Sequence, residues 1–261
     1  MLALIAGTGD LPGALLARLE DRPLVCALEG FLPSVPPDVT FRIERLGSFL
    51  GNLHLRGVRE VCMAGAVKRP YFDASKIDEE TAPLVPAVLE AMAKGDDGAL
   101  RALIAIIEGR GFVVRAAHEI APDLLPPSGV PTETGPDAGM LREAAVGTTR
   151  LAAMGRADSG QACLIKGSTV VVEEGPDGTD AMILGAGEKG RGAILFKGPK
   201  PGQDRRADLP VIGPRTAEAA VAAGLRGIII EAGGVMVLDM PEVLSRLDAA
   251  GISLWVREPV S

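Results

Sequence analysis

The sequence predicts an α/β protein with an N-terminal Rossmann-like parallel-sheet domain and a distinct C-terminal α/β domain. Hydrophobic residues make up 47% of the 261-residue chain and aromatic residues only 3%, so its core has to be aliphatic, which suits α/β layers better than a β-sandwich. A glycine turn follows the first apolar run, as in a βαβ unit. A segment rich in Pro and Gly then divides the chain near its middle.

The first element is a predicted βαβ unit. Met1 to Ala6 reads as a buried strand, a helical pattern follows the turn at 7–13, and Leu24 to Leu28 reads as a second strand. A nucleotide commonly binds at the turn of such a unit, against the start of its helix.

The turn itself departs from the dinucleotide fingerprint. Pro12 stands at the third glycine position, and Gly13 comes one residue late. As an N-cap, Asp10 would occupy the helix amides and repel an anion. We therefore expect the Gly7-Thr8-Gly9-Asp10 turn to contact a base or ribose rather than phosphate; a tight turn with an aspartate cap is the simpler alternative.

A second glycine turn follows the predicted strand Glu60 to Met63. If the sheet is parallel, this turn lies at the same edge as the first, and Gly65 and Lys68 would contact the same nucleotide. Solvent exposure is the alternative explanation for the adjacent cations Lys68 and Arg69. The remaining N-terminal elements are predicted as helices at 47–56 and 99–108 and a strand at 111–115.

The boundary between the domains is predicted at 122–136, where prolines and glycines interrupt every periodic pattern. We assign 1–130 to a Rossmann-like nucleotide-binding domain and 137–261 to a distinct C-terminal α/β domain. In the second domain the pattern predicts a helix at 137–154, a hairpin ending at 169–172, a helix beginning near Asp180 that Thr179 or Asp177 caps, and a strand at 194–196. It then predicts helices at 215–225 and 241–250 and strands at 227–230 and 252–256.

The loop within 193–214 is the strongest candidate site. Pro199, Pro201 and Pro210, together with two glycines, exclude a helix or a central strand, yet the loop contains seven charged or amide side chains. A rigid backbone is typical of loops whose polar side chains must be held in a fixed geometry for binding or catalysis. Lysines and arginines suit phosphate, while the carboxylates of Asp204 and Asp208 suit Mg²⁺ or Mn²⁺. The alternative is a solvated loop whose charges pair with each other.

Charge and cysteine content exclude several classes of protein. The net charge of −7 and the scarcity of aromatic residues argue against nucleic-acid binding. Cys26, Cys62 and Cys163 lack the spacing of a disulfide framework or a thiolate zinc site, which fits a reducing cytoplasm. The first residues read as a strand rather than a signal peptide, and no apolar run approaches the length of a membrane span.

Several motifs resemble those of a known family, the metal-dependent UDP-2,3-diacylglucosamine pyrophosphatases of lipid A biosynthesis that are unrelated to calcineurin-like phosphoesterases. The resemblance covers nearly the whole chain. The motifs are Ile5-Ala6-Gly7-Thr8-Gly9-Asp10-Leu11-Pro12, Asp158-Ser159-Gly160-Gln161, Gly178-Thr179-Asp180-Ala181-Met182, Pro201-Gly202-Gln203-Asp204, Arg206 with Asp208-Leu209-Pro210, and Gly213-Pro214. One departure is that Asp177 precedes Gly178, where the family pattern has Glu.

The resemblance implies hydrolysis of UDP-2,3-diacylglucosamine to UMP and 2,3-diacylglucosamine 1-phosphate (lipid X), with Mg²⁺ or Mn²⁺ as cofactor. It implies that the substrate lies between the two domains, that the C-terminal domain at 137–261 is catalytic and binds the lipid, and that Asp208 is the essential acid. We expect Asp208, with Asp204 or Asp180, to bind the cation or position the attacking water. The remaining assignments are that Lys197 and Arg206 hold the diphosphate, and that Gln203 and Thr179 donate hydrogen bonds.

We expect a cytoplasmic location, in agreement with the cysteine pattern, with peripheral contact at the cytoplasmic side of the inner membrane and a homodimer as open alternatives. Two other functions compete. An NAD(P)-dependent oxidoreductase would place Glu29 on a ribose hydroxyl, and a non-catalytic carrier would use the basic loop only to bind a nucleotide-sugar or lipid.

Overall fold

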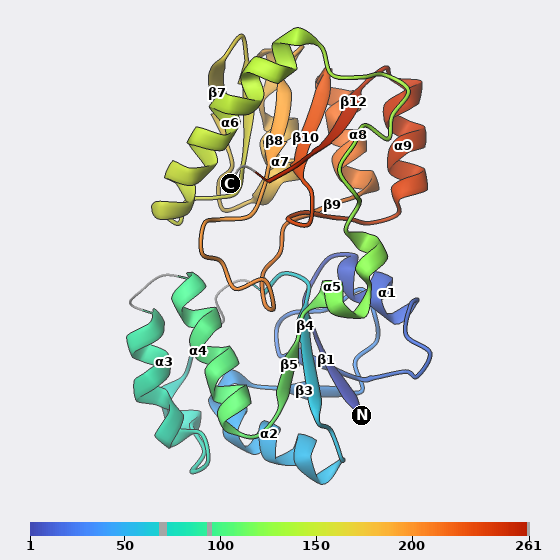
Figure 1. Ribbon diagram of the computed structural model, residues 1–261. Helices are drawn as coiled ribbons and strands as arrows, with labels where there is room; N and C mark the ends of the chain where they lie inside the picture. Colours follow the sequence, from blue (N-terminus) through green and yellow to red (C-terminus); the bar gives the residue numbers. More distant parts are fainter. Residues whose placement is uncertain (68–71, 93–95, 260–261) are drawn as a thin grey trace. The chain divides into compact units, whose positions relative to one another are not determined.

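The computed structural model in Figure 1 describes residues 1–67, 72–92 and 96–259. The chain divides into two compact units. The first consists of Met1–Pro122 together with Asp204–Asp208, and the second of Asp123–Gln203 together with Leu209–Ser261. A five-residue segment encoded in the C-terminal half therefore belongs to the N-terminal unit.

The first unit is built on a parallel five-stranded sheet in the order β3-β2-β1-β4-β5. This is the strand order of doubly wound nucleotide-binding sheets, so the Rossmann-like prediction is confirmed. The turns after β1 and β4 lie where the strand order reverses, the usual place for a ligand in such sheets. The strands are β1 (Leu2–Ala6), β2 (Leu24–Leu28), β3 (Val39–Phe41), β4 (Glu60–Ala64) and β5 (Val113–Arg115).

Helices α2 and α4 bury their apolar faces in one cluster with the strands of the first sheet. Leu50 and Leu53 of α2 and Ile104 and Ile107 of α4 are spaced three residues apart, which places each pair on one helix face. The helices are α1 (Leu11–Leu16), α2 (Leu46–Leu55), α3 (Val85–Met92), α4 (Asp96–Gly109) and α5 (Ala117–Ile120), with short 3₁₀ turns at Ile43–Arg45, Ala74–Lys76 and Ala82–Leu84.

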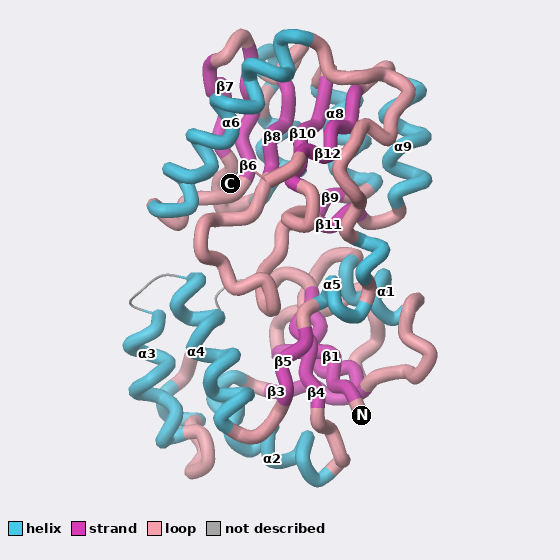
Figure 2. Tube along the Cα trace, in the orientation of Figure 1, coloured by secondary structure: helices cyan, strands magenta, loops and turns pink. Residues whose placement is uncertain are grey.

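The second unit contains a mixed five-stranded sheet in the order β12-β10-β8-β6-β7, seen side by side in Figure 2. Strands β12, β10 and β8 are parallel, while β6 is antiparallel to both β8 and β7, which confirms the predicted hairpin. The strands are β6 (Ala162–Lys166), β7 (Thr169–Glu173), β8 (Ile194–Lys197), β10 (Gly227–Glu231) and β12 (Ser253–Arg257), with a separate parallel pair of β9 (Val211–Ile212) and β11 (Met236–Val237).

Helices cover both faces of this sheet. Residues of α7, α8 and α9 share one apolar cluster with the strands, and residues of α6 share another on the opposite face. The helices are α6 (Ala138–Arg156), α7 (Gly178–Gly185), α8 (Pro214–Ala223) and α9 (Met240–Ala249), with 3₁₀ turns at Pro122–Leu124 and Gly187–Lys189. As predicted, Asp137 caps α6, because its side chain accepts a hydrogen bond of 2.7 Å from the Met140 N–H.

Of the predicted boundary segment at 122–136, Pro122 belongs to the first unit and residues 123–136 belong to the second. Gly129 forms an isolated bridge with Val256, and the Thr132 hydroxyl accepts a hydrogen bond from the Leu254 N–H at 2.9 Å. None of the helices within the described ranges combines the length and the apolar character that a membrane span requires.

The three cysteines are buried and free. Burial raises the pKa of each thiol, at Cys26, Cys62 and Cys163, to about 12. All three therefore stay protonated near neutral pH, and none is a nucleophile or a ready metal ligand.

Candidate functional site

A buried lysine stands at the carboxyl end of β8. Lys197 is only 5% exposed, and its Nζ donates a hydrogen bond of 2.6 Å to Oγ1 of Thr179 on α7. The Thr179 hydroxyl in turn donates to Oε1 of Glu174, whose other oxygen accepts from the Gln161 N–H at 2.7 Å. An ammonium group removed from water needs such compensation. The structure thus brings together two predicted site residues, Lys197 and Thr179, within the second unit.

The start of α7 differs from its predicted capping. Asp177 is the N-cap residue but makes no side-chain capping hydrogen bond, and the Thr179 hydroxyl is bonded to Lys197 and Glu174 instead. Glu174 precedes Thr179 by five residues. The family pattern has a glutamate directly before the Gly-Thr-Asp motif at 178–180, and this sequence has Asp177 there. The hydrogen bond to Thr179 nevertheless places the Glu174 carboxylate beside the motif.

Gln161, the last residue of the motif at 158–161, extends this cluster. Its backbone N–H bonds Glu174, and its carbonyl accepts from the Gly198 N–H at 3.2 Å. Its side-chain Oε1 is a buried atom that has no hydrogen-bond partner among the described residues. A buried acceptor of this kind is costly unless a bound group satisfies it.

The loop from Gly198 to Pro210 forms neither helix nor strand, as predicted. Its first part is fastened to the second unit. Lys200 forms an ion pair of 2.6 Å with Asp158, and Gln203 Oε1 accepts a hydrogen bond from the Lys200 N–H at 3.0 Å. The amide oxygen of Gln203 thus accepts a hydrogen bond from the loop backbone. Its role as a hydrogen-bond donor to the substrate stays a prediction.

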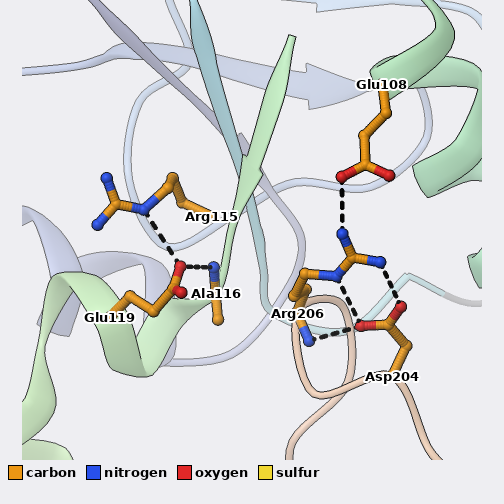
Figure 3. Close-up of polar contacts among 6 residues, drawn as sticks. All are labelled: Glu108, Arg115, Ala116, Glu119, Asp204 and Arg206. Carbon is orange, nitrogen blue, oxygen red and sulfur yellow. Dashed lines mark hydrogen bonds and ion pairs between the residues drawn. The ribbon is translucent and has the colours of Figure 1, made fainter.

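The second part of the loop, Asp204–Asp208, is held in the first unit (Figure 3). The Arg206 guanidinium donates to both carboxylate oxygens of Asp204, at 3.0 and 2.7 Å, and Nη1 donates to Glu108 of α4 at 2.7 Å. The hydrogen bond from Arg206 lowers the pKa of Asp204, and the same contact raises the pKa of Arg206. The predicted phosphate ligand Arg206 and the predicted metal ligand Asp204 thus bind each other.

Asp208 is the last residue of this segment. It is half-buried, and its backbone N–H donates to the Asp204 carbonyl at 3.2 Å. The next residue, Leu209, is buried and belongs to the second unit. The predicted essential acid therefore lies in the first unit, whereas Lys197, Thr179 and Gln203 lie in the second.

The predicted metal ligand Asp180 has a partner within the second unit. Its carboxylate accepts a hydrogen bond of 2.8 Å from Thr216, and this contact joins α7 to α8. Asp204 and Asp208 lie in the first unit. Over residues 1–67, 72–92 and 96–259, no group of three or more His, Cys, Asp or Glu side chains could hold a metal ion.

The glycine turn after β1 is closed against the turn after β4. The Gly7 N–H donates to the Ala64 carbonyl, and Thr8 and Ala66 exchange backbone hydrogen bonds of 2.8 and 2.9 Å. A Cβ atom on Gly7 would lie 2.6 Å from the Ala66 carbonyl oxygen, and one on Gly65 would lie 2.7 Å from that of Thr8. The amides of Gly7 and Thr8 are therefore used within the protein, consistent with a turn that does not cradle phosphate.

The rest of this turn is more open. Gly9 has a φ of +93°, a Cβ added to it would have no atom within 4 Å, and its carbonyl accepts from the Ser34 hydroxyl. Asp10 is the N-cap of α1 without a side-chain capping hydrogen bond, contrary to its predicted capping. Lys68, predicted to contact the nucleotide, lies outside the described residues.

Glu29, the candidate ribose ligand of the oxidoreductase alternative, is paired elsewhere. Its carboxylate lies 2.6 Å from the guanidinium of Arg42, which also contacts the buried Glu44. Burial raises the pKa of Glu44, but hydrogen bonds from the Asp73 N–H and Arg42 outweigh it and lower the pKa. Glu44 is therefore ionised, and the Arg42 pairs connect elements of the first unit.

A cavity of about 210 Å³ lies in the second unit, at the carboxyl ends of β8 and β10 and beside α6. Apolar side chains of Leu151, Phe196, Pro199 and Ile230 contribute to its walls, and Arg257, Glu231 and Glu258 add charged groups. Two of these, Phe196 and Pro199, flank Lys197-Gly198 in the sequence. The cavity is thus next to the buried lysine along the chain.

Family models cover almost the entire chain. The LpxI N-terminal domain matches residues 1–124, and the LpxI C-terminal domain matches residues 127–255. The chain belongs to the LpxI family.

A relative that aligns over nearly the full chain supports membership of the LpxI family. The "UDP-2,3-diacylglucosamine pyrophosphatase LpxI" of Caulobacter vibrioides is 34% identical over 274 aligned positions, which cover 99% of this chain and 98% of that protein. Among solved structures, form 1 of Acinetobacter baumannii RibD matches 44% of this chain and 35% of its own, with 16% identity and a TM-score of 0.29. A similarity of that size supports no conclusion about the LpxI site.

Sequence reasoning missed three residues around the LpxI candidate site: Glu108, Glu174 and Gln161. The sequence contained a signal for two of them. Glu174 belongs to the acidic run before Gly178, and Gln161 closes the family motif at 158–161. Glu108 had no signal, because its contact with Arg206 spans 98 residues.

Proposed function

We propose that this protein hydrolyses the diphosphate bond of UDP-2,3-diacylglucosamine to UMP and 2,3-diacylglucosamine 1-phosphate. The observation that supports this most directly is the 34% identity, over 99% of the chain, to a relative named for that pyrophosphatase activity. The substrate class is then a small lipid-linked nucleotide sugar.

The chemistry of the described side chains agrees with diphosphate hydrolysis. In the transition state, negative charge increases on the nonbridging and leaving-group oxygens of the diphosphate. A cation that is already positioned and shielded from water stabilises this charge. Lys197 is a buried cation at the carboxyl end of a parallel strand, where α/β sheets bind ligands. We assign Lys197 to a phosphate oxygen and Asp208 to the attacking water.

The need for Mg²⁺ or Mn²⁺ is a separate part of the proposal. The predicted ligands Asp204 and Asp180 accept hydrogen bonds from Arg206 and Thr216, and the described carboxylates do not form a three-ligand group. These residues do not fit a protein-only metal cage. Loss of UMP release in EDTA, restored by Mn²⁺ or Mg²⁺ alone, would support the requirement.

The cavity beside Lys197-Gly198 supports binding of an acylated substrate. Its walls of Leu151, Phe196 and Ile230 offer apolar surface to an acyl chain. A cytoplasmic location, peripheral contact with the inner membrane and a homodimer complete the proposal; flotation with anionic vesicles and sedimentation of the purified protein test the last two.

The deciding experiment measures UMP release from UDP-2,3-diacylglucosamine by wild type, Asp208→Asn and the control Asp21→Asn. Asp21 is an exposed aspartate of the first unit. Asp208→Asn should lose at least about a thousandfold in kcat/KM, because loss of a positioned water costs several kcal/mol of barrier. The assignment of Asp208 fails if its variant stays within a few-fold of the control. Wild type that binds the substrate but returns it intact would favour the carrier.

A further inference from the structure

The segment Asp204–Asp208 matches one face of α4 in charge. Arg101 and Glu108 are seven residues apart, about two turns, and so lie on the same face of α4. Arg206 is paired with Glu108, while the charge of Arg101 contributes to the lowered pKa of Asp204. The ion pair between Arg206 and Glu108 thus joins opposite charges of the segment and the helix, and the positive charge of Arg101 on the same helix adds to the stabilisation of ionised Asp204.

Apolar contact reinforces this match. Ala207 packs against the buried cluster of the first unit that includes Ile104 and Ile107 of α4. The segment itself is a compact turn, because the N–H groups of Ala207 and Asp208 both donate to the Asp204 carbonyl, at 3.1 and 3.2 Å. The Arg206 guanidinium also bonds the Asp204 carboxylate, so both backbone and side-chain hydrogen bonds hold the turn together.

We propose that Glu108 is a positioning residue: by holding Arg206 it fixes the turn Asp204–Asp208 on α4, and so fixes where the Asp208 carboxylate is presented. The role in hydrolysis rests on the proposed function. Arg206 then acts on Asp208 through the turn and makes no contact with the diphosphate. Among Glu108, Arg206 and Asp208, only Glu108 lies outside the sequence motifs of the C-terminal half.

The test compares Glu108→Gln with a matched pair in the same unit. Arg115 and Glu119 form an ion pair of 3.1 Å, drawn beside the first pair in Figure 3, with side-chain exposures of 37% and 47%. The corresponding exposures of Arg206 and Glu108 are 38% and 43%. Glu119→Gln therefore removes an equivalent charge from the first unit without touching the turn.

The first readout is independent of activity. Trypsin binds the side chain of the arginine after which it cleaves, so we expect cleavage after Arg206 only when this side chain has left Asp204 and Glu108. Glu108→Gln should speed this cleavage about fivefold or more, as loss of a charged hydrogen bond shifts such an opening equilibrium, while Glu119→Gln should match wild type. Equal cleavage of Glu108→Gln and wild type would overturn the docking role of Glu108.

The second readout is kinetic. Glu108→Gln should lower kcat about tenfold or more with KM within twofold, because a displaced Asp208 affects the chemical step rather than binding. The double variant Glu108→Gln, Arg206→Gln should be no slower than Arg206→Gln alone. Additive losses, or an effect on KM alone, would show that Arg206 binds substrate directly and refute the proposal. Wild type without UMP release would refute the proposed function and with it the kinetic role, while the trypsin result still decides the docking.

Discussion

The Nζ atom of Lys197 lies 2.6 Å from Oγ1 of Thr179, and the two residues are only 5% and 6% exposed. The Thr179 hydroxyl uses its single proton to bond Glu174, so it connects a cation to a carboxylate through one oxygen. Buried networks of this kind are stabilising only while every member is satisfied.

Thr179→Val should therefore destabilise the protein, because valine keeps the shape of threonine but removes the bridging hydroxyl. The expected loss is roughly 1–3 kcal/mol in the free energy of unfolding, the usual cost of leaving a buried polar group without its partner. Thr179→Ser, which retains the hydroxyl, is the control and should lose less. Urea unfolding measures both; equal stability of the two variants would show that the hydroxyl bridge contributes nothing.

Gly65→Ala should destabilise the first unit through two effects. Gly65 has a φ of +91°, and a Cβ there would lie 2.7 Å from the Thr8 carbonyl oxygen. Gly57 is the matched control, because its φ is +79° but no atom lies within 4 Å of the Cβ position. Gly57→Ala should cost about 1–2 kcal/mol from backbone strain alone.

The difference between these two alanine variants isolates the close contact between the turns after β1 and β4. Thermal unfolding should show Gly65→Ala to be the less stable of the two. Equal unfolding temperatures of the two variants would contradict the close contact between the turns that the backbone hydrogen bonds of Thr8 and Ala66 indicate.

Asp204→Asn should change the dependence of stability on pH. Arg206 lowers the pKa of Asp204 below its ordinary value of 3.8. Because the folded-state pKa is the lower one, ionised Asp204 stabilises the protein above the unfolded-state pKa, and this contribution is lost as pH falls through the folded-state pKa.

Between about pH 5 and pH 2, wild type should therefore lose more unfolding free energy than Asp204→Asn. At pH 7 the variant should be less stable by roughly 1–3 kcal/mol, because a charge-assisted pair is replaced by a neutral one. Asp21→Asn serves as the surface control. Parallel stability curves for wild type and Asp204→Asn would contradict the ion pair with Arg206.

Ala152→Leu should narrow the cavity of the second unit and weaken binding of long acyl chains. Ala152 lines the cavity on α6, whereas Ala145 is exposed on the same helix and provides the control Ala145→Leu. Each methylene excluded from the cavity loses about 0.8 kcal/mol, or about fourfold in KM.

The measurement is the ratio of KM values for long-chain and short-chain diacyl substrates. Ala152→Leu should raise this ratio and Ala145→Leu should leave it unchanged. An unchanged ratio in both variants would place the acyl chains elsewhere.

The sequence by itself determined the local elements and the family. Buried apolar runs such as Leu2–Ala6, the helical pattern of α4 and the cap at Asp137 depend on neighbouring residues, and each was predictable from a short window. The motifs that define the family were also readable along the chain. The concentration of polar residues between rigid prolines and glycines singled out the loop that contains Asp208.

Only the tertiary structure decided the partners of those polar side chains. Charge pattern alone could not tell that Arg206 binds Asp204 and Glu108, or that Glu174 reaches Thr179, because an ion pair forms wherever folding brings two charges within a few ångströms. Contacts between Arg206 and Glu108 span 98 residues. The fold thus placed Asp204–Asp208 in the N-terminal unit, against its position in the sequence, since only there do α4 and its apolar cluster offer the segment complementary charge and a surface to bury.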